Sequence, residues 1–422
     1  MPVSPAPSLT PVLDAAARER TRSGRQFLHV PGPTNIPQRV LNAMQRPAVD
    51  FASPAFMDIA VDCFERMKPL FGTEGEVFFY TASGHGAWEA VFVNLFQPGD
   101  TVLMPETGRF SLTWGDMAKA LGLKIVTVPN DWRRAIDIDA LETILRQDTA
   151  GQIKGVLAVH TETATGVTSD MRAIRAAMDK AGHPALLVVD AIASFMTTPL
   201  PMDDWGIDAV IAASQKGLMM PPGMSFAAAG PKALAATGEV TTFRNYWSWS
   251  ERLGMEQYRR FCGTAPEHLV FALREAITML EEWGLPAVFA RHERLAGAVR
   301  AAVSEWSRGG ALEFNVIDPA QRAASLTVVR RTDGGDAEDI RFTARENFDV
   351  ATGGGMSRLA GLAFRIGHMG DLNDPMVLGA LGGIEGALYQ CGIPFESGLQ
   401  AAMRHLAETA PRITRADKRV IL

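Results

Sequence analysis

The stretch 185–216, ALLVVDAIASFMTTPLPMDDWGIDAVIAASQK, contains two short apolar runs, and each ends beside a residue that can carry charge. The run ALLVVD ends in Asp190, and the run DAVIAAS is followed by Gln215 and Lys216. Near-continuous apolar runs of this length are typical of strands covered on both faces, as in a parallel sheet. Because burying an unpaired carboxylate or ammonium is costly, Asp190 and Lys216 are the first candidates for a functional site.

The same pattern of short strands extends outward from this stretch, over roughly residues 76–230. Apolar runs at 76–82, 100–106, 124–129 and 155–160 read as further strands, and amphipathic segments at 86–96, 111–122, 137–147 and 170–182 read as helices between them. Strand–helix alternation predicts an α/β fold with a mostly parallel sheet flanked by helices. Such sheets bind ligands beyond the carboxyl ends of their strands.

The flanking parts of the chain differ from this α/β region. The polar, Pro-rich start lacks the apolar core of a signal peptide and predicts an N-terminal leader or arm over 1–27. A long amphipathic segment at 269–284 leads out of the α/β region, and mixed helix and strand patterns follow it. We therefore predict a large domain over 28–295 and a smaller α+β domain over 296–422.

Composition excludes several classes of protein. The 422 residues carry a net charge of −6, which offers no general field for nucleic acid or an anionic membrane surface. No apolar run is long enough to span a bilayer. The three cysteines are widely spaced, which fits a reducing compartment and supplies no metal-binding pattern. These features favour a cytoplasmic protein without a metal site.

The segment YTASGHGAWEA, residues 80–90, places Ser83, Gly84 and His85 between a strand and a helix. Glycines let the backbone turn sharply, and amides at a helix start form an anion site, most simply for a phosphate. An ordinary tight turn explains the same residues equally well. The segment is not a dinucleotide fingerprint, because Glu89 stands where the third glycine would be.

Asp190 and Lys216 also have ordinary explanations when each is taken alone: a helix N-cap for the aspartate, and a side chain that reaches solvent for the lysine. Their combination with the 83–85 turn is more specific. Pyridoxal phosphate needs a lysine that forms an imine, an acid for its pyridinium nitrogen and an anion site for its phosphate. Trp114 is the candidate aromatic to stack on the ring, although a tryptophan in an amphipathic helix is more often part of the core.

Six segments together resemble the class V aminotransferases, in the serine–glyoxylate and alanine–glyoxylate branch. They are HVPGPTNIP, SGHGAWEA, HTETATGVTSD, VVDAIASF, SQKGLMMPPG and FRIGHMGD, and they extend over residues 28–372. The resemblance implies fold type I of the pyridoxal-phosphate enzymes, with a seven-stranded, mostly parallel sheet. It also implies a small C-terminal domain and a homodimer with shared active sites.

The resemblance assigns the Schiff-base lysine to Lys216 and the partner of the pyridinium nitrogen to Asp190. The remaining cofactor contacts that it implies are Ser83, Gly84 and His85 at the phosphate turn, Gln215 beside the lysine, Trp114 as the stacking aromatic and Thr163 at the cofactor's 3-oxygen or the substrate.

On the substrate side, the resemblance implies that Gly32 lies in a covering loop and that Arg365 binds the α-carboxylate. A guanidinium binds a carboxylate with two parallel hydrogen bonds, and Arg365 lies within an apolar segment, which favours a site over a surface position. Thr264 matches a residue that reaches the phosphate of the neighbouring subunit. Phe261 departs from the family pattern, because relatives often carry a phosphate-binding tyrosine there and a phenyl ring cannot donate a hydrogen bond.

We therefore expect ping-pong transamination between a small amino acid, such as serine or alanine, and glyoxylate or a similar 2-oxo acid. A different amino donor, a pyridoxal-phosphate lyase such as a desulfurase or aldolase, and a simple phosphate-binding module are the alternatives. A desulfurase would need a nucleophilic cysteine on a mobile loop, and neither Cys262 nor Cys391 has flexible flanking residues. The aromatic segment 241–254 is expected either to shape the substrate pocket or to pack in a dimer interface.

Overall fold

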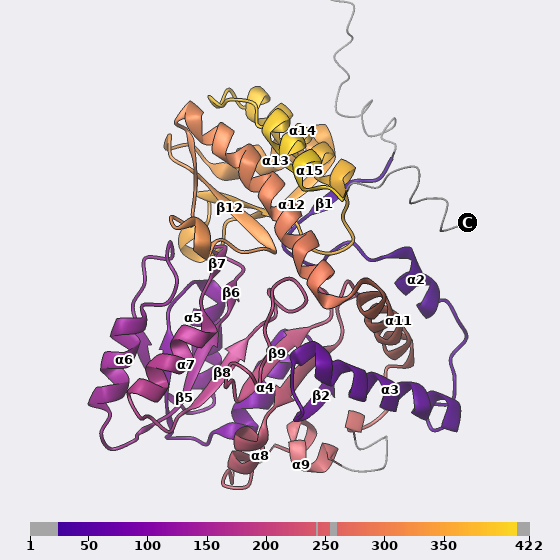
Figure 1. Cartoon of the computed structure of the whole chain (residues 1–422), viewed down its shortest axis with the longest axis vertical. Coiled ribbons are helices and arrows are strands. Elements are labelled where there is room, and N and C mark those ends of the chain that lie inside the picture. The colour runs from indigo at the N-terminus through magenta and orange to yellow at the C-terminus, as the bar shows by residue number, and fades with distance from the viewer. Residues whose placement is uncertain (1–23, 242–243, 254–259, 412–422) are drawn as a thin grey trace, which may run out of the picture.

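A computed structural model of the chain describes residues 24–241, 244–253 and 260–411 (Figure 1). Most of the leader expected at 1–27 lies outside these residues. The described chain forms two layered regions, one below the other in Figure 1, joined by a long helix, α12 (Leu285–Trp306).

The lower region is built on a seven-stranded sheet, which confirms the fold expected from the sequence. The strand order is β2 (Glu76–Tyr80), β10 (Ser225–Ala229), β9 (Ala209–Ala213), β8 (Leu186–Asp190), β5 (Ile153–Val159), β3 (Thr101–Pro105) and β4 (Lys124–Val128). Only β10 runs antiparallel to its neighbours, and the other pairs are parallel. The six predicted strands are all present. The seventh, β10, has the sequence SFAAA, in which alanine gives little strand signal.

Helices cover both faces of this sheet, so its strands are apolar along their whole length. Along β2, Phe79 belongs to the core on one face and Phe78 to the core on the other, as expected when successive side chains alternate. The covering helices are α3 (Pro54–Phe71), α4 (Gly84–Leu95), α5 (Arg109–Ala120), α6 (Ile138–Gln147), α7 (Met171–Lys180), α8 (Pro231–Thr237) and α11 (Glu267–Trp283).

The upper region is a five-stranded sheet with its own core. Its strand order is β1 (Phe27–His29), β13 (Val350–Gly354), β14 (Ala363–Gly367), β12 (Leu326–Arg331) and β11 (Leu312–Phe314), and it is accompanied by α12, α13 (Ala337–Phe348), α14 (Asp374–Gln390) and α15 (Leu399–Thr409). In Figure 1 the indigo β1 lies among the orange and yellow C-terminal elements. The domain boundary at 295/296 stays a prediction, and it falls within α12.

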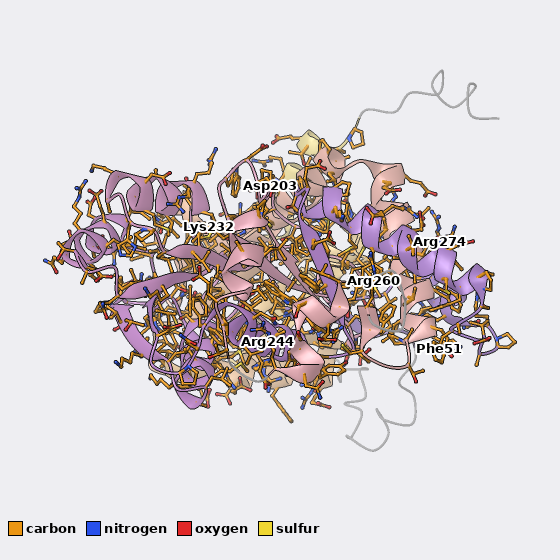
Figure 2. The ribbon with its side chains drawn as sticks, turned by 90° about the horizontal axis from the view of Figure 1, so that it is seen from below. Phe51, Asp203, Lys232, Arg244, Arg260 and Arg274 are labelled. Carbon is orange, nitrogen blue, oxygen red and sulfur yellow. The ribbon has the colours of Figure 1, made fainter. Side chains whose placement is uncertain are left out.

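The remaining elements are short. They are the helices α2 (Gln38–Met44) and α9 (Trp249–Arg252), the hairpin β6 (Thr161–Glu162) and β7 (Val167–Thr168), and four 3-10 turns at Asn245–Trp247, Ser307–Gly309, Pro319–Gln321 and Ser357–Leu359. Figure 2 shows the molecule from below, with Lys232 of α8 and Arg274 of α11 well apart along its width. Within the described ranges, no helix has both the length and the apolar composition that crossing a membrane requires.

Candidate active site

A cavity of about 160 Å³ lies at the carboxyl ends of β5, β8 and β9. This is the edge at which a parallel sheet is expected to bind its ligand. Eight of the eleven candidate residues line it: Gly32, Ser83, Gly84, His85, Thr163, Asp190, Gln215 and Lys216. The cavity therefore brings together segments that are spread over residues 32–216.

Lys216 follows β9 and is buried, with 8% of its surface exposed. Its ammonium nitrogen donates a hydrogen bond to the carbonyl oxygen of Pro31. Burial lowers the pKa of Lys216 to about 8; the positive charge of Arg365 acts in the same direction and the charge of Asp190 opposes it. A lysine in this state is partly neutral near physiological pH, as a nucleophile or a proton acceptor must be.

Gly32 packs directly against this lysine. A Cβ atom at Gly32 would lie 2.6 Å from Lys216 Nζ and 2.7 Å from its Cδ. The residue also has φ +92°, in the region that favours glycine. Only glycine lets the loop approach the lysine this closely.

Gly32→Ala should therefore displace Lys216 and weaken cofactor binding by about tenfold or more, since strain of this kind costs on the order of 1–3 kcal/mol. Gly99→Ala is the matched control, because Gly99 has φ +97° with no atom within 4 Å of its would-be Cβ. The dissociation constant of the cofactor, measured by absorbance titration, checks the prediction. Equal losses in the two variants would show that backbone strain alone, and not contact with Lys216, explains the effect.

Asp190 ends β8 and is 4% exposed. Its Oδ2 accepts a hydrogen bond of 3.0 Å from Trp88 Nε1, and its Oδ1 accepts one of 2.7 Å from the amide of Ile192. Burial raises the pKa of Asp190 to about 6, although both hydrogen bonds and Lys216 favour the ionised form. The carboxylate is thus held in one orientation at the cavity wall.

Sequence reasoning did not find Trp88, which lines the cavity and orients Asp190. The available signal was its position four residues after Gly84 on α4, on the same side of the helix as the turn. A buried indole N–H requires an acceptor, and Asp190 is that acceptor.

The turn before α4 has the properties of an anion site. Ser83 is the N-cap residue of α4, but its side chain caps no amide, so the hydroxyl is available to a ligand. A Cβ at Gly84 would lie 2.4 Å from Ile192 Cδ1, so the absence of a side chain lets this turn pack closely against Ile192, which also lines the cavity. Burial and the charge of Arg109 lower the pKa of His85. Gln215 also lines the cavity, and its side-chain NH2 group can donate hydrogen bonds to an anion.

Trp114 requires a correction. It is fully buried, with its ring centroid 5.9 Å from that of Trp88 and 5.6 Å from that of Phe92, and it does not line the cavity. Phe110, one helical turn earlier on α5, lines the cavity instead. Only the first turn of α5 lies at the cavity. Trp114 is one turn farther along the helix, where it packs on Trp88 in the core.

Arg365 lies on β14, in the upper sheet, and is largely buried. Its Nε donates to the carbonyl of Gly354 at 2.7 Å, and its Nη1 donates to the carbonyl of Thr163 at 3.2 Å. Burial lowers the pKa of Arg365 to about 10, and Glu162 opposes this shift. Thr163 lines the cavity, so its contact with Arg365 connects the upper sheet to the site.

Two candidates in the 261–264 segment lie away from this cavity. Thr264 is exposed and does not line it. Phe261 is 3% exposed and packs on Phe64 and Phe79, at ring-centroid distances of 5.6 and 6.5 Å. The ring that replaces the expected tyrosine is therefore part of the core.

The described part of segment 241–254 packs against β2, the strand that leads into the Ser83–His85 turn. Trp249 stacks on Phe78 at 4.8 Å and donates a 2.6 Å hydrogen bond to the Tyr80 hydroxyl. Within the described ranges no cysteine lines the cavity, and Cys391 lies at the end of α14, near Thr343. No group of three or more potential metal ligands occurs in the same ranges.

Comparisons with known proteins agree with this geometry. The profile of the family described as aminotransferase class-V matches residues 26–360. The chain is 41% identical over 396 residues to the serine–glyoxylate aminotransferase of Methylorubrum extorquens, which covers 92% of this chain and 97% of that protein. It is 37% identical over 385 residues to the L-aspartate–glyoxylate aminotransferase of Paracoccus denitrificans, and the match covers 90% of this chain and 96% of that protein.

Among solved structures, the ureidoglycine–glyoxylate aminotransferase of Bacillus subtilis superposes with a TM-score of 0.82 at 28% identity, over 92% of this chain and 99% of that one. The resemblance stated from the sequence motifs is thus confirmed at the level of family and fold. The chain belongs to the class-V aminotransferases, the pyridoxal-phosphate-dependent transaminases of fold type I.

Proposed function

We propose that this enzyme transfers the amino group of a small α-amino acid, serine or alanine, to glyoxylate by ping-pong transamination. The observation that carries the reaction type is the meeting of Lys216, Asp190 and the Ser83–His85 turn in one cavity. The acceptor is supported by the relatives, because those from M. extorquens, P. denitrificans and B. subtilis are all named for glyoxylate. The amino donors in the names of these relatives differ. The proposal of a serine-type donor is supported by the 41% identity to the serine–glyoxylate aminotransferase.

The residues of the cavity fit pyridoxal phosphate. The Ser83–His85 turn and Gln215 would hold its phosphate, and Asp190 its ring nitrogen. Phe110, in place of Trp114, would lie against the ring. When bound, the cofactor supplies an electron sink for the pair of electrons left when the donor's α-proton is removed.

Lys216 is the residue that moves protons in this scheme. Its partly neutral amine can accept the α-proton of the donor and return a proton during the same half-reaction. The surrounding apolar and loop residues keep water away from Nζ, which is what lowers its pKa. Asp190 stays ionised above pH 6 and so stabilises positive charge at the ring nitrogen.

Arg365 would bind the substrate carboxylate. Its two described hydrogen bonds use Nε and Nη1, and within the described chain none uses Nη2. A guanidinium anchored in this way is oriented before the substrate arrives, which reduces the entropy lost on binding. The carbonyl of Thr163, which accepts from Arg365, sets that orientation.

A panel of amino donors tests the proposal. Under single-turnover conditions, serine and alanine should change the absorbance of the bound cofactor at least about tenfold faster than aspartate, and glyoxylate should reverse the change. A tenfold preference corresponds to about 1.4 kcal/mol, which one well-placed contact supplies. A faster reaction with aspartate would reassign the donor, and no reaction with any amino acid would refute transamination.

We also propose a homodimer in which Thr264 reaches the site of the second subunit, and a cytoplasmic location. Exposure of Thr264 outside its own cavity supports the first, and the spacing of three cysteines supports the second. Light scattering with Thr264→Ala and the unchanged enzyme checks the dimer model. The Thr264→Ala variant should remain dimeric but bind pyridoxal phosphate more weakly than the unchanged enzyme. An unchanged enzyme that is monomeric and still binds pyridoxal phosphate tightly would contradict the dimer model.

A further inference from the structure

Glu162 is a buried acidic residue that none of the roles above uses. It ends β6, which pairs with β7 in a two-stranded antiparallel hairpin, and its exposed surface is 0%. Its chain neighbours Thr161 and Thr163 both line the cavity. A fully buried carboxylate this close to a site requires an explanation, because its desolvation is costly.

The carboxylate is bonded to the start of α5. Its Oε2 accepts hydrogen bonds from the amides of Phe110 at 3.0 Å and Ser111 at 3.1 Å, and its Oε1 accepts one from Ala164 at 3.0 Å. Phe110 and Ser111 belong to the first turn of α5, whose amides have no partners within the helix. Glu162 therefore caps α5 from a different element of the fold.

Gly108 makes room for this contact. A Cβ atom at Gly108 would lie 2.4 Å from Glu162 Cγ and 2.6 Å from its Cδ. Gly108 is the N-cap position of α5, where a serine, threonine or aspartate would ordinarily cap the helix with its own side chain. Ser111 Oγ accepts a hydrogen bond of 3.1 Å from the Gly108 amide, but glycine has no side chain to cap the amides of Phe110 and Ser111, and the distant carboxylate of Glu162 accepts from them instead.

Opposing effects act on the ionisation of Glu162: its hydrogen bonds favour the charged form, whereas burial and the negative charge of Asp190 disfavour it. Burial raises the pKa of Glu162 to about 7, and the three amides that it accepts from lower it. The positive end of the α5 dipole and the guanidinium of Arg365 also attract the carboxylate. The group is thus poised to hold the helix strongly when ionised and less strongly when neutral.

We propose that Glu162 is a positioning residue: its carboxylate fixes the first turn of α5 and thereby places Phe110 against the cofactor ring. The inference rests on the proposed function for the role of Phe110, but the link from Glu162 to α5 stands without it. Glu162 acts through Phe110 and need not touch cofactor or substrate. Removing the Glu162 carboxylate should therefore first increase the mobility of the first turn of α5, and should affect cofactor binding only through that change.

Amide hydrogen exchange of the full-length protein, with and without cofactor, tests the link to α5. Glu162→Gln should speed exchange at Phe110 and Ser111 about tenfold, because hydrogen bonds to a charged acceptor are roughly twice as strong as neutral ones. Glu142→Gln is the matched control, since Glu142 on α6 pairs with Arg146 of the same helix and with Lys180 of α7 and does not line the cavity. Exchange within twofold of wild type at both amides would overturn the proposal.

A double-mutant cycle tests the step from α5 to the cofactor. Glu162→Gln alone should weaken cofactor binding about tenfold, and in the Phe110→Ala background it should have less than a threefold effect, since the two residues act in series. Additive losses would overturn the positioning role. If Phe110→Ala leaves affinity unchanged while exchange still accelerates, the assignment of Phe110 under the proposed function fails and the capping of α5 by Glu162 stands.

Discussion

Replacing Lys216 by alanine is expected to abolish transamination, with turnover falling by at least about 10⁴-fold, the upper end of what a proton-transferring group contributes. Among the described residues that line the cavity, Lys216 is the only lysine, so no second lysine amine can accept the proton in its place. The variant should still fold, because alanine leaves the apolar walls in place and removes a buried amine. Steady-state rates with serine and glyoxylate measure the effect.

Two further variants make the result specific to Lys216. Lys180→Ala removes a surface lysine whose side chain is 68% exposed, and it should keep full activity. Lys216→Arg keeps a positive charge but cannot be deprotonated near neutral pH, so it should be as inactive as the alanine variant. An arginine variant with more than about a tenth of wild-type activity would disprove the role of a neutral amine, since a tenfold loss is only about 1.4 kcal/mol.

The pH dependence of cofactor uptake follows from the pKa of about 8 for Lys216. Only the neutral amine can attack a carbonyl, so the rate at which the cofactor-free protein takes up pyridoxal phosphate should rise with pH. Below pH 8 the rise should be about tenfold per pH unit, with a plateau above it. Stopped-flow absorbance gives this profile, and a plateau only above pH 10 would show a lysine with an ordinary pKa.

The sequence allowed prediction of most of the large sheet, because covered strands are continuous apolar runs and the helices between them are strongly periodic. It could not place β1 in the upper sheet. That strand pairs with β13, from near the other end of the chain, and neither segment carries a signal for the other. Pairing between distant segments depends on how the two layers dock, which local patterns do not encode.

The site shows the same division. Asp190 and Lys216 were predicted because they end apolar strands, and strand ends of one sheet meet at one edge. Phe110 and Trp114 are four residues apart on α5, on one face of the helix, so sequence alone could not say which of them lines the cavity. The position of the first turn decides it, and Glu162, bonded to that turn, is distant in sequence.

Asp190→Asn is expected to lower turnover by about 10²–10³-fold, the usual loss when one electrostatic stabiliser of a developing charge is removed. Asparagine keeps the size of the side chain but cannot stabilise a protonated ring nitrogen by its charge. Asparagine also has only one acceptor oxygen, so it can accept a hydrogen bond from the indole N–H of Trp88 or from the amide of Ile192, but not from both as Asp190 does. Single-turnover absorbance with serine measures the step, and Asp179→Asn, on the surface of α7, is the control.

The same substitution should make the cofactor-free protein more stable. Because burial raises the pKa of Asp190 from 3.8 to about 6, the folded state binds the proton more tightly than the unfolded state. Stability is therefore lost as pH rises from about 4 to 6, and at neutral pH the buried charge costs on the order of 3 kcal/mol. The melting temperature of cofactor-free Asp190→Asn should exceed that of wild type at pH 8, and the difference should shrink near pH 4. If the variant is less stable than wild type at pH 8, the hydrogen bonds from Trp88 and Ile192 stabilise the ionised carboxylate by more than its burial costs. In that case, keeping Asp190 ionised does not lower the stability of the folded protein.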